Sequence, residues 1–310
     1  MRLPFPPTCL AACAALVLLA GCGGGEKKPC GTPGSGWIAY HGQRDGKYEI
    51  RAVAREGGCD VQVAEGPTGK TNPSMSLAAG LLAWWTSEAG QTQLVVAGLD
   101  GASPRVLDVG TLVAARPELS PDGKYLAFDG KTAALQPDIY VVPVAGGAPV
   151  VLAQDPALDQ LPSWTADGKA LVFGSNRSGG YQIWKVDADG TGLVQLTTDD
   201  TAVFQCGAKA CAPSGKAALS PDGKTLAFTR TRPDGTGSVV LRDLATGAEH
   251  ALADAVELEP SWSPDGKELS VASSIYGGDF EIVVRSAASG AVLARLTHTP
   301  GVDGAPFFAR

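Results

Sequence analysis

The sequence predicts an all-β fold, namely a six-bladed β-propeller whose blades are four-stranded antiparallel sheets. A five-residue run, Ser-Pro-Asp-Gly-Lys, occurs at 120–124, 220–224 and 263–267, and a degenerate copy occupies 165–169. The copies fit a repeat of about 44 residues, which is the length of a propeller blade and exceeds that of most solenoid repeats. The two ends of the chain also carry complementary fragments of one further repeat.

The repeated run has the chemistry of a hairpin turn. Proline fixes φ at the second position of a type I turn, aspartate is tolerated at the third, and glycine takes the left-handed position that follows. Alternating apolar residues come next, as at 126–128. Each copy therefore indicates the turn between the first and second strands of a blade, with a glycine bulge.

The clearest repeat predicts all four strands of one blade. They are expected at 161–164, 170–175, 181–186 and 193–197, with turn residues at 167–168, 178–180 and 189–190. The third strands of two other repeats, 138–142 and 280–284, are apolar on both faces, as expected for strands that pack between neighbouring blades.

The termini predict how the ring closes. Residues 36–40 match a second strand with no first strand before it, and residues 303–308 match a first strand with nothing after it. The C-terminal segment would therefore supply the inner strand of the first blade, which removes an exposed sheet edge. The other five blades are marked by a residue three positions before each turn: Pro73, Pro117, Pro162, Ala217 and Pro260.

The N-terminal segment predicts export and lipidation. Residues 1–21 read as a lipoprotein signal peptide, with Arg2, an apolar stretch at 10–19 and a small-residue cleavage site that ends at Cys22. Cys22 would carry the lipid, residues 22–35 would form a tether and 36–310 the propeller. The alternative is an ordinary signal peptide with a chance cysteine. Lipidation predicts a cell-envelope location facing the periplasm or the cell surface, and the glycine after Cys22 favours the outer membrane.

Cysteine usage agrees with an oxidising compartment. Four cysteines remain in the mature chain besides Cys22, namely Cys30, Cys59, Cys206 and Cys211. Three pairings are possible, and we favour Cys30 with Cys59 and Cys206 with Cys211. The alternative is a four-cysteine zinc site, but the paired C-x-x-C spacing typical of such sites is absent.

Composition excludes one class of partner. The net charge is -7, and no run of lysine or arginine provides the concentrated basic surface that a phosphate backbone requires. We therefore expect no nucleic-acid partner. Forty glycines and 22 prolines suit many short strands joined by tight turns.

These motifs resemble the TolB-like family of six-bladed propellers with WD40-like Pro-Asp repeats. The run 260–267 has the family's Pro-x-Trp-Ser-Pro-Asp-Gly-Lys pattern, and 126–128 and 139–141 match its Leu-Ala-Phe and Ile-Tyr-Val segments. The resemblance covers nearly all of the mature chain and implies the fold. TolB itself acts in the envelope-spanning Tol-Pal system, has an additional N-terminal domain and is soluble in the periplasm. The second repeat departs from the family pattern, because residues 76–80 lack the Pro-Asp turn.

Antiparallel order divides the loops between two faces. Connections between strands one and two, and between strands three and four, form what we call the turn face; connections between strands two and three, and between blades, form the irregular face. Variable loops on a rigid scaffold are where binding usually resides. The binding candidates on the irregular face are Arg44, Arg177, Arg230, Arg232, Tyr276 and Phe204. The alternative is that these are ordinary solvated loop residues.

Charged residues also recur at the expected mouth of the central channel. Three positions before the marker residue lie Lys70, Asp159, Glu257 and Asp303. Converging carboxylates can hold a hard cation, but solvated or capping carboxylates are the interpretation that we favour. We therefore predict no metal and no cofactor.

The function that these features favour is a non-enzymatic, lipid-anchored binding scaffold. The chain has three histidines without metal-ligand spacing, no G-x-S-x-G motif and no phosphate-binding loop. The expected partner is an envelope protein or a cell-wall component. One alternative is a propeller lyase or hydrolase, in which Arg44, Arg177 or Arg230 binds an anionic saccharide and a channel metal acts as Lewis acid. Another is a structural subunit of a larger complex.

Overall fold

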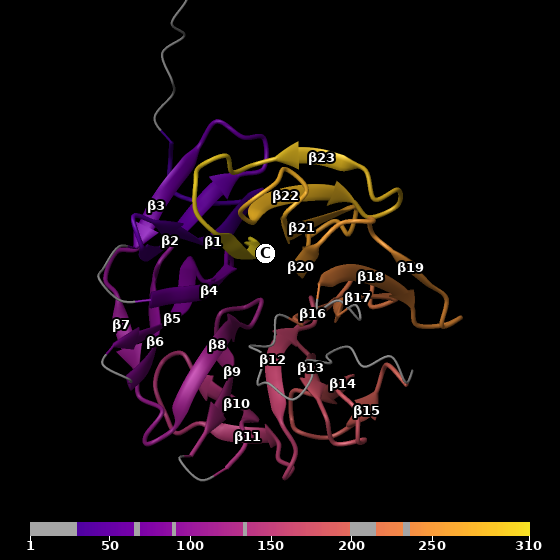
Figure 1. The fold of residues 1–310 in the computed structure, drawn as a ribbon. Coiled ribbons are helices and arrows are strands. Elements are labelled where there is room, and N and C mark those ends of the chain that lie inside the picture. The colour runs from indigo at the N-terminus through magenta and orange to yellow at the C-terminus, as the bar shows by residue number, and fades with distance from the viewer. Residues whose placement is uncertain (1–29, 65–68, 89–90, 133–134, 199–214, 232–235) are drawn as a thin grey trace, which may run out of the picture. The chain divides into compact units, whose positions relative to one another are not determined.

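Six four-stranded antiparallel sheets are arranged around a central axis (Figure 1). The computed structural model describes residues 30–64, 69–88, 91–132, 135–198, 215–231 and 236–310. The propeller unit is Gly31–Arg310. The predicted six-bladed propeller is confirmed.

Each blade extends outward from an inner strand that lies beside the axis. From the inside outward, blade 1 has β24 (Asp303–Phe308), β1 (Trp37–Arg44), β2 (Lys47–Ala54) and β3 (Asp60–Ala64); blade 2 has β4 (Gly69–Ser76), β5 (Leu81–Glu88), β6 (Gln91–Gly98) and β7 (Arg105–Leu107). Blade 3 has β8 (Val113–Leu119), β9 (Tyr125–Lys131), β10 (Asp138–Pro143) and β11 (Val150–Ala153); blade 4 has β12 (Asp159–Trp164), β13 (Ala170–Ser175), β14 (Gln182–Asp187) and β15 (Val194–Gln195). Blade 5 has β16 (Ala217–Leu219), β17 (Thr225–Thr231), β18 (Gly237–Asp243) and β19 (Glu249–Ala251); blade 6 has β20 (Glu257–Trp262), β21 (Glu268–Ser273), β22 (Glu281–Ser286) and β23 (Val292–Arg295).

The C-terminal strand closes the ring as predicted. β24 pairs with β1 in antiparallel register, with Ile38 opposite Phe308 and Gly42 opposite Asp303. In Figure 1 the yellow end of the chain lies at the centre beside the indigo strands of blade 1. The inner edge of blade 1 is therefore covered, and the first and last blades are joined.

Strand bounds in blade 4 differ from the prediction mainly at the ends. The second strand, β13, has the predicted bounds. The inner strand begins two residues earlier, at Asp159, and the outer strand shortens to Val194–Gln195. The outer strand has a pairing partner on one side only, so the residues at its ends lose their strand hydrogen bonds more readily than those of the inner strands.

The Pro-Asp turns are fixed by their own side chains. In blade 3 the Ser120 hydroxyl donates to Asp122 Oδ1 at 2.7 Å, and Asp122 Oδ1 also accepts the Lys124 N–H at 3.1 Å. The Tyr125 N–H donates to Ser120 Oγ at 3.0 Å. The turns at 165–169, 220–224 and 263–267 repeat these bonds. Blade 2 keeps a turn without proline and aspartate, closed by the Gly80 N–H donating to the Leu77 carbonyl at 3.2 Å.

Five inner strands share a left-handed residue immediately before the marker proline. Its φ lies between 48° and 59° at Asn72, Arg116, Leu161, Glu259 and Ala305. The ladder of each of these strands shifts register at or beside this position. A non-glycine residue in this conformation is uncommon, and its recurrence indicates a bulge built into the inner strand of the repeat.

Neighbouring blades are joined through the inner strands and by apolar packing. The indole Nε1–H of Trp164 donates to the Glu118 carbonyl, and that of Trp262 to the Ala218 carbonyl, both at 3.1 Å. In the described part of the chain, buried apolar residues form one cluster at each junction between neighbouring blades. This explains the apolar residues on both faces of the third strands.

Several predicted positions lie outside the described residues, namely Cys22, Phe204, Cys206, Cys211 and Arg232. Cys30 and Cys59 are both disulfide-bonded. The predicted pairing of these two cysteines with each other stays a prediction. The described ranges contain no helix with the length and apolar character needed to cross a membrane.

Candidate functional site

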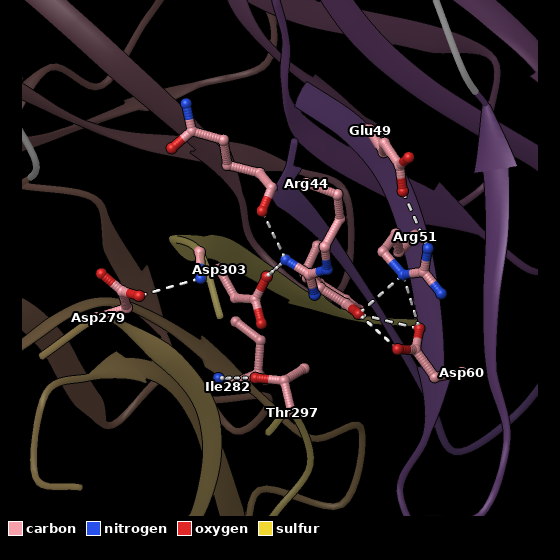
Figure 2. A network of polar contacts seen from close by, with 11 residues as sticks. Arg44, Glu49, Arg51, Asp60, Asp279, Ile282, Thr297 and Asp303 are labelled. Carbon is pink, nitrogen blue, oxygen red and sulfur yellow. Dashed lines mark hydrogen bonds and ion pairs between the residues drawn. The ribbon is translucent and has the colours of Figure 1, made fainter. Parts of the chain in front are cut away.

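The carboxylates predicted at the channel mouth are buried and already partnered. Asp303 is fully buried and receives a hydrogen bond from Arg44 Nη1 at 2.6 Å, and Figure 2 shows the two side chains facing each other. Arg44 also donates to the Gln43 carbonyl at 3.0 Å. Burial raises the pKa of Asp303, although the charge of Arg44 opposes this shift. A channel-facing cation would have to displace this arginine.

Asp159 repeats the arrangement in blade 4. Its Oδ2 accepts from Arg177 Nη2 at 2.5 Å, and the carboxylate is fully buried. Burial raises the pKa of Asp159 to about 6. The Arg177 guanidinium also lies 5.4 Å from the ring centre of Phe173 and 5.3 Å from that of Trp184. The stacking and the ion pair leave only 8% of the Arg177 side chain exposed.

The third carboxylate, Glu257, is buried between two donors. Its Oε1 accepts from Ser273 Oγ at 2.9 Å and from Arg285 Nε at 2.6 Å. The fourth predicted position, Lys70, lies in β4 opposite Thr86. Within the described ranges, no group of three or more histidine, cysteine, aspartate or glutamate side chains is placed to hold a metal ion.

The two other candidates that the structure describes on the irregular face, Arg230 and Tyr276, are also engaged. Arg230 Nη1 lies 2.8 Å from Glu249 Oε2, and its guanidinium is 5.2 Å from the ring centre of Phe228. Tyr276 is 43% exposed, and the guanidinium carbon of Arg295 lies 4.3 Å from the centre of its ring. Arg44, Arg177 and Arg230 thus neutralise carboxylates of the protein itself. An anionic saccharide would compete with these internal ion pairs.

A cluster of charged residues from three blades, which the sequence did not reveal, lies where the inner strands approach the turn face. Glu118 in β8 is 1% exposed and pairs with Lys216 Nζ at 2.9 Å and with the C-terminal Arg310. Burial raises the pKa of Glu118, but the charges of Lys216 and Arg310 outweigh it and hold the pKa below its ordinary value. Beside this triad lies a cavity of about 20 Å³, lined by residues that include Asn72, Leu161 and Ala305. Such a volume holds about one water molecule.

Two larger hollows lie on the irregular face. One, of about 710 Å³, is formed by the β9–β10 and β11–β12 loops and is lined by Lys131, Leu135, Gln136, Asp138, Gln154, Asp155 and Pro156. The other, of about 520 Å³, is formed by the start of β6 and the β7–β8 connection, including Val109 and Leu112. Leu135 is 60% exposed at the edge of the first hollow. The sequence predicted this face but not these positions, because an exposed leucine or glutamine in a loop carries no motif.

Comparison with known proteins identifies the family. The model of PD40, the TolB beta propeller domain, matches residues 35–217, more than half of the chain. The chain belongs to the TolB β-propeller family.

Individual TolB proteins match parts of the chain. A TolB homologue of Chlorobium chlorochromatii is 30% identical over 146 residues, which is 46% of this chain and 29% of that protein. The Tol-Pal system protein TolB of Bordetella pertussis is 40% identical over 53 residues, 17% of this chain and 12% of that protein. The chain thus spans less than a third of the length of these curated relatives.

The likeness to TolB also extends to a solved structure. TolB from Acinetobacter baumannii superposes with a TM-score of 0.68 at 22% identity, covering 88% of this chain and 66% of that one. At this identity the likeness shows the shared TolB propeller fold.

Proposed function

We propose that this TolB-family propeller is a non-enzymatic binding scaffold of the bacterial cell envelope, anchored by a lipid on Cys22. Its irregular face would bind an envelope protein or a cell-wall component. The observation that carries the proposal is the contrast between the faces. In the described part of the chain, hollows of about 710 and 520 Å³ open on the irregular face, whereas four turns of the turn face are closed by the same internal hydrogen bonds.

The hollow at blade 3 is the binding site that we propose on this face. It combines an exposed apolar side chain, Leu135, with polar groups of Gln136, Gln154 and Asp155. Pockets that pair an apolar surface with a few polar groups are typical of binding sites. The arginines predicted from the sequence would then support the loops around the site instead of contacting the partner.

The test is a crosslinking pull-down of the detergent-extracted, acylated protein from its own envelope, with partners identified by mass spectrometry. Sedimentation with purified cell-wall sacculi tests the second partner class. The variant Leu135→Arg places a bulky charge in the hollow, and we expect it to reduce recovery of the partner at least tenfold, about 1.4 kcal/mol.

The matched control is Tyr125→Arg, which changes an exposed apolar residue of the same blade near the turn face. Tyr125 is 45% exposed at the start of β9. Full partner recovery with Tyr125→Arg and loss with Leu135→Arg supports the proposal. Equal recovery with both variants contradicts the assignment of the face, and turnover of a glycan or peptide by the purified protein contradicts the scaffold function.

A further inference from the structure

The chain enters the propeller from the turn face. β1 begins at Trp37, which pairs with Ala54, and the next residue, Ile38, pairs with Phe308 at the far end of β24. The turn-face ends of three strands therefore meet at the point where the chain arrives. The other end of β1 lies at the irregular face, where Gly42 is opposite Asp303.

Hydrogen bonds hold this entry point at the level of the turns. The Arg55 N–H donates to the Gly36 carbonyl at 2.8 Å, and Arg55 pairs with Glu268 through Nε at 2.5 Å. Glu268 directly follows the Pro-Asp turn of blade 6. Cys59 belongs to the same face, because its carbonyl accepts the Ala54 N–H at 2.9 Å. A disulfide between Cys30 and Cys59, as predicted, would fix the chain there one residue before the propeller unit.

The length of chain between the lipid and this entry point is limited. Eight residues lie between Cys22 and Gly31, and the nine steps from one Cα to the next span at most about 32 Å even when fully extended. Blade strands of six to eight residues span about 20–26 Å. The irregular face is therefore about one sheet height farther along the chain path from the lipid than the turn face is.

We propose that the turn face is the surface that lies against the phospholipid bilayer, and that the irregular face is directed away from it. This orientation rests on the proposed acylation of Cys22. It leaves both hollows of the irregular face open to a partner on the side away from the membrane.

The charges of the turn face indicate that the tether, and not attraction to anionic lipid, sets the orientation. The Nζ of each exposed lysine in the Pro-Asp turns lies 3.0–4.0 Å from Oδ2 of the aspartate of the same turn. The pairs are Lys124 with Asp122, Lys169 with Asp167, Lys224 with Asp222 and Lys267 with Asp265. The turns therefore carry no surplus positive charge. The orientation should be the same on neutral and on anionic vesicles.

The experiment measures resonance energy transfer from a dye on the protein to an acceptor lipid in phosphatidylcholine vesicles. Acylated full-length protein carries the dye either at Lys169→Cys on the turn face or at Ser178→Cys on the irregular face. Both positions belong to blade 4 and are exposed. The parent protein, without an introduced cysteine, sets the labelling background.

We expect at least about twofold higher transfer from position 169 than from position 178, because one sheet height of about 20 Å separates the faces. Equal or reversed transfer overturns the orientation. An insertion of about 30 Gly/Ser residues between Gly25 and Glu26 should abolish the difference, since such a linker reaches past the propeller. Persistence of the difference in that variant would show that the tether is not its cause.

Flotation with the vesicles separates this inference from the proposed function. A Cys22→Ser variant should stay in the soluble fraction while the acylated protein floats. Failure of the acylated protein to float contradicts the lipid anchor itself. Flotation with equal transfer from the two labels contradicts only the orientation.

Discussion

The imidazole of His41, in β1, lies against the inner strand of blade 1, where Gly304 leaves room for it. A Cβ on Gly304 would lie 2.9 Å from His41 Nε2. Among the described residues, Nδ1 is buried without a hydrogen-bond partner, and the ring meets Tyr48 edge-on at 5.6 Å. Burial lowers the pKa of His41 from 6.5 to about 4. The folded protein therefore holds this side chain neutral.

The pKa of His41 predicts a loss of stability in acid. The unfolded chain binds this proton near pH 6.5 and the folded chain only near pH 4, so stability falls as the pH drops through this range. Replacing His41→Gln should remove about 2–3 kcal/mol of the difference in unfolding free energy between pH 7.5 and pH 4.5. Urea unfolding of the parent protein and of the His41→Gln variant at both pH values measures this difference in unfolding free energy.

Asp159 acts with the opposite sign and must be separated from His41. Its pKa is raised to about 6, so protonation of the folded state below this value favours folding. The comparison of His41→Gln with the parent protein at each pH cancels this contribution. An unchanged pH dependence in the variant would contradict the role assigned to His41.

At the scale of single elements, the Pro-Asp turns share one backbone conformation but differ in the atoms that surround them. Gly123 and Gly223 occupy the same turn position with φ of 66° and 72°. A Cβ on Gly123 would lie 2.2 Å from the Cβ of Ala79 in the neighbouring blade 2 turn, whereas a Cβ on Gly223 would meet nothing within 4 Å. One position is restricted by conformation and packing, the other by conformation alone.

This difference predicts unequal costs for the same substitution. Gly223→Ala should lower the free energy of unfolding by about 1–2 kcal/mol, the cost of a left-handed alanine. Gly123→Ala should cost at least about 1 kcal/mol more, because overpacking is added. Chemical denaturation measures both variants, and Ala79→Gly added to Gly123→Ala should recover the additional part. Equal costs for the two single variants would show that the blade 2 turn moves aside freely.

For the whole molecule, ring closure depends on the last strand. All six residues of β24 are buried, and Phe307 and Phe308 contribute to the clusters at the junctions of blade 1 with its two neighbours. Arg310 forms an ion pair with Glu118, and its guanidinium carbon lies 4.9 Å from the ring centre of Phe307. The carbonyl of Arg310 accepts a hydrogen bond from the Leu77 N–H. Closure thus joins residues from both ends of the chain.

Removing residues 302–310 should therefore abolish cooperative folding, because loss of two buried phenylalanines alone costs several kcal/mol, about 3–5 for each. Near-ultraviolet circular dichroism and urea unfolding measure this. Arg310→Ala is the control, since it keeps β24 and should remain cooperatively folded. A synthetic 302–310 peptide added in excess should restore signal to the truncated chain. An unchanged unfolding midpoint after truncation would show that closure contributes little.

The sequence by itself determined the blades, the turns and the closure of this propeller. Proline, aspartate and glycine determine the backbone conformation within a few residues. The turn at 120–124 and its copies can therefore be recognised from the sequence alone. The period between them then places the strands, and complementary fragments at 36–40 and 303–308 reveal how the ends meet. The irregular face follows from antiparallel order alone.

Only the tertiary structure decided what the residues of that face do. Arg44 and Asp303 are 259 positions apart, and Arg310 and Glu118 are 192 apart, so no local pattern signals either ion pair. In the sequence, an arginine that binds an external anion cannot be distinguished from an arginine that neutralises a buried carboxylate of the protein. The fold settles this, because burying a charge is costly unless a partner of opposite sign lies beside it, and that partner comes from whichever strand the closed ring brings near.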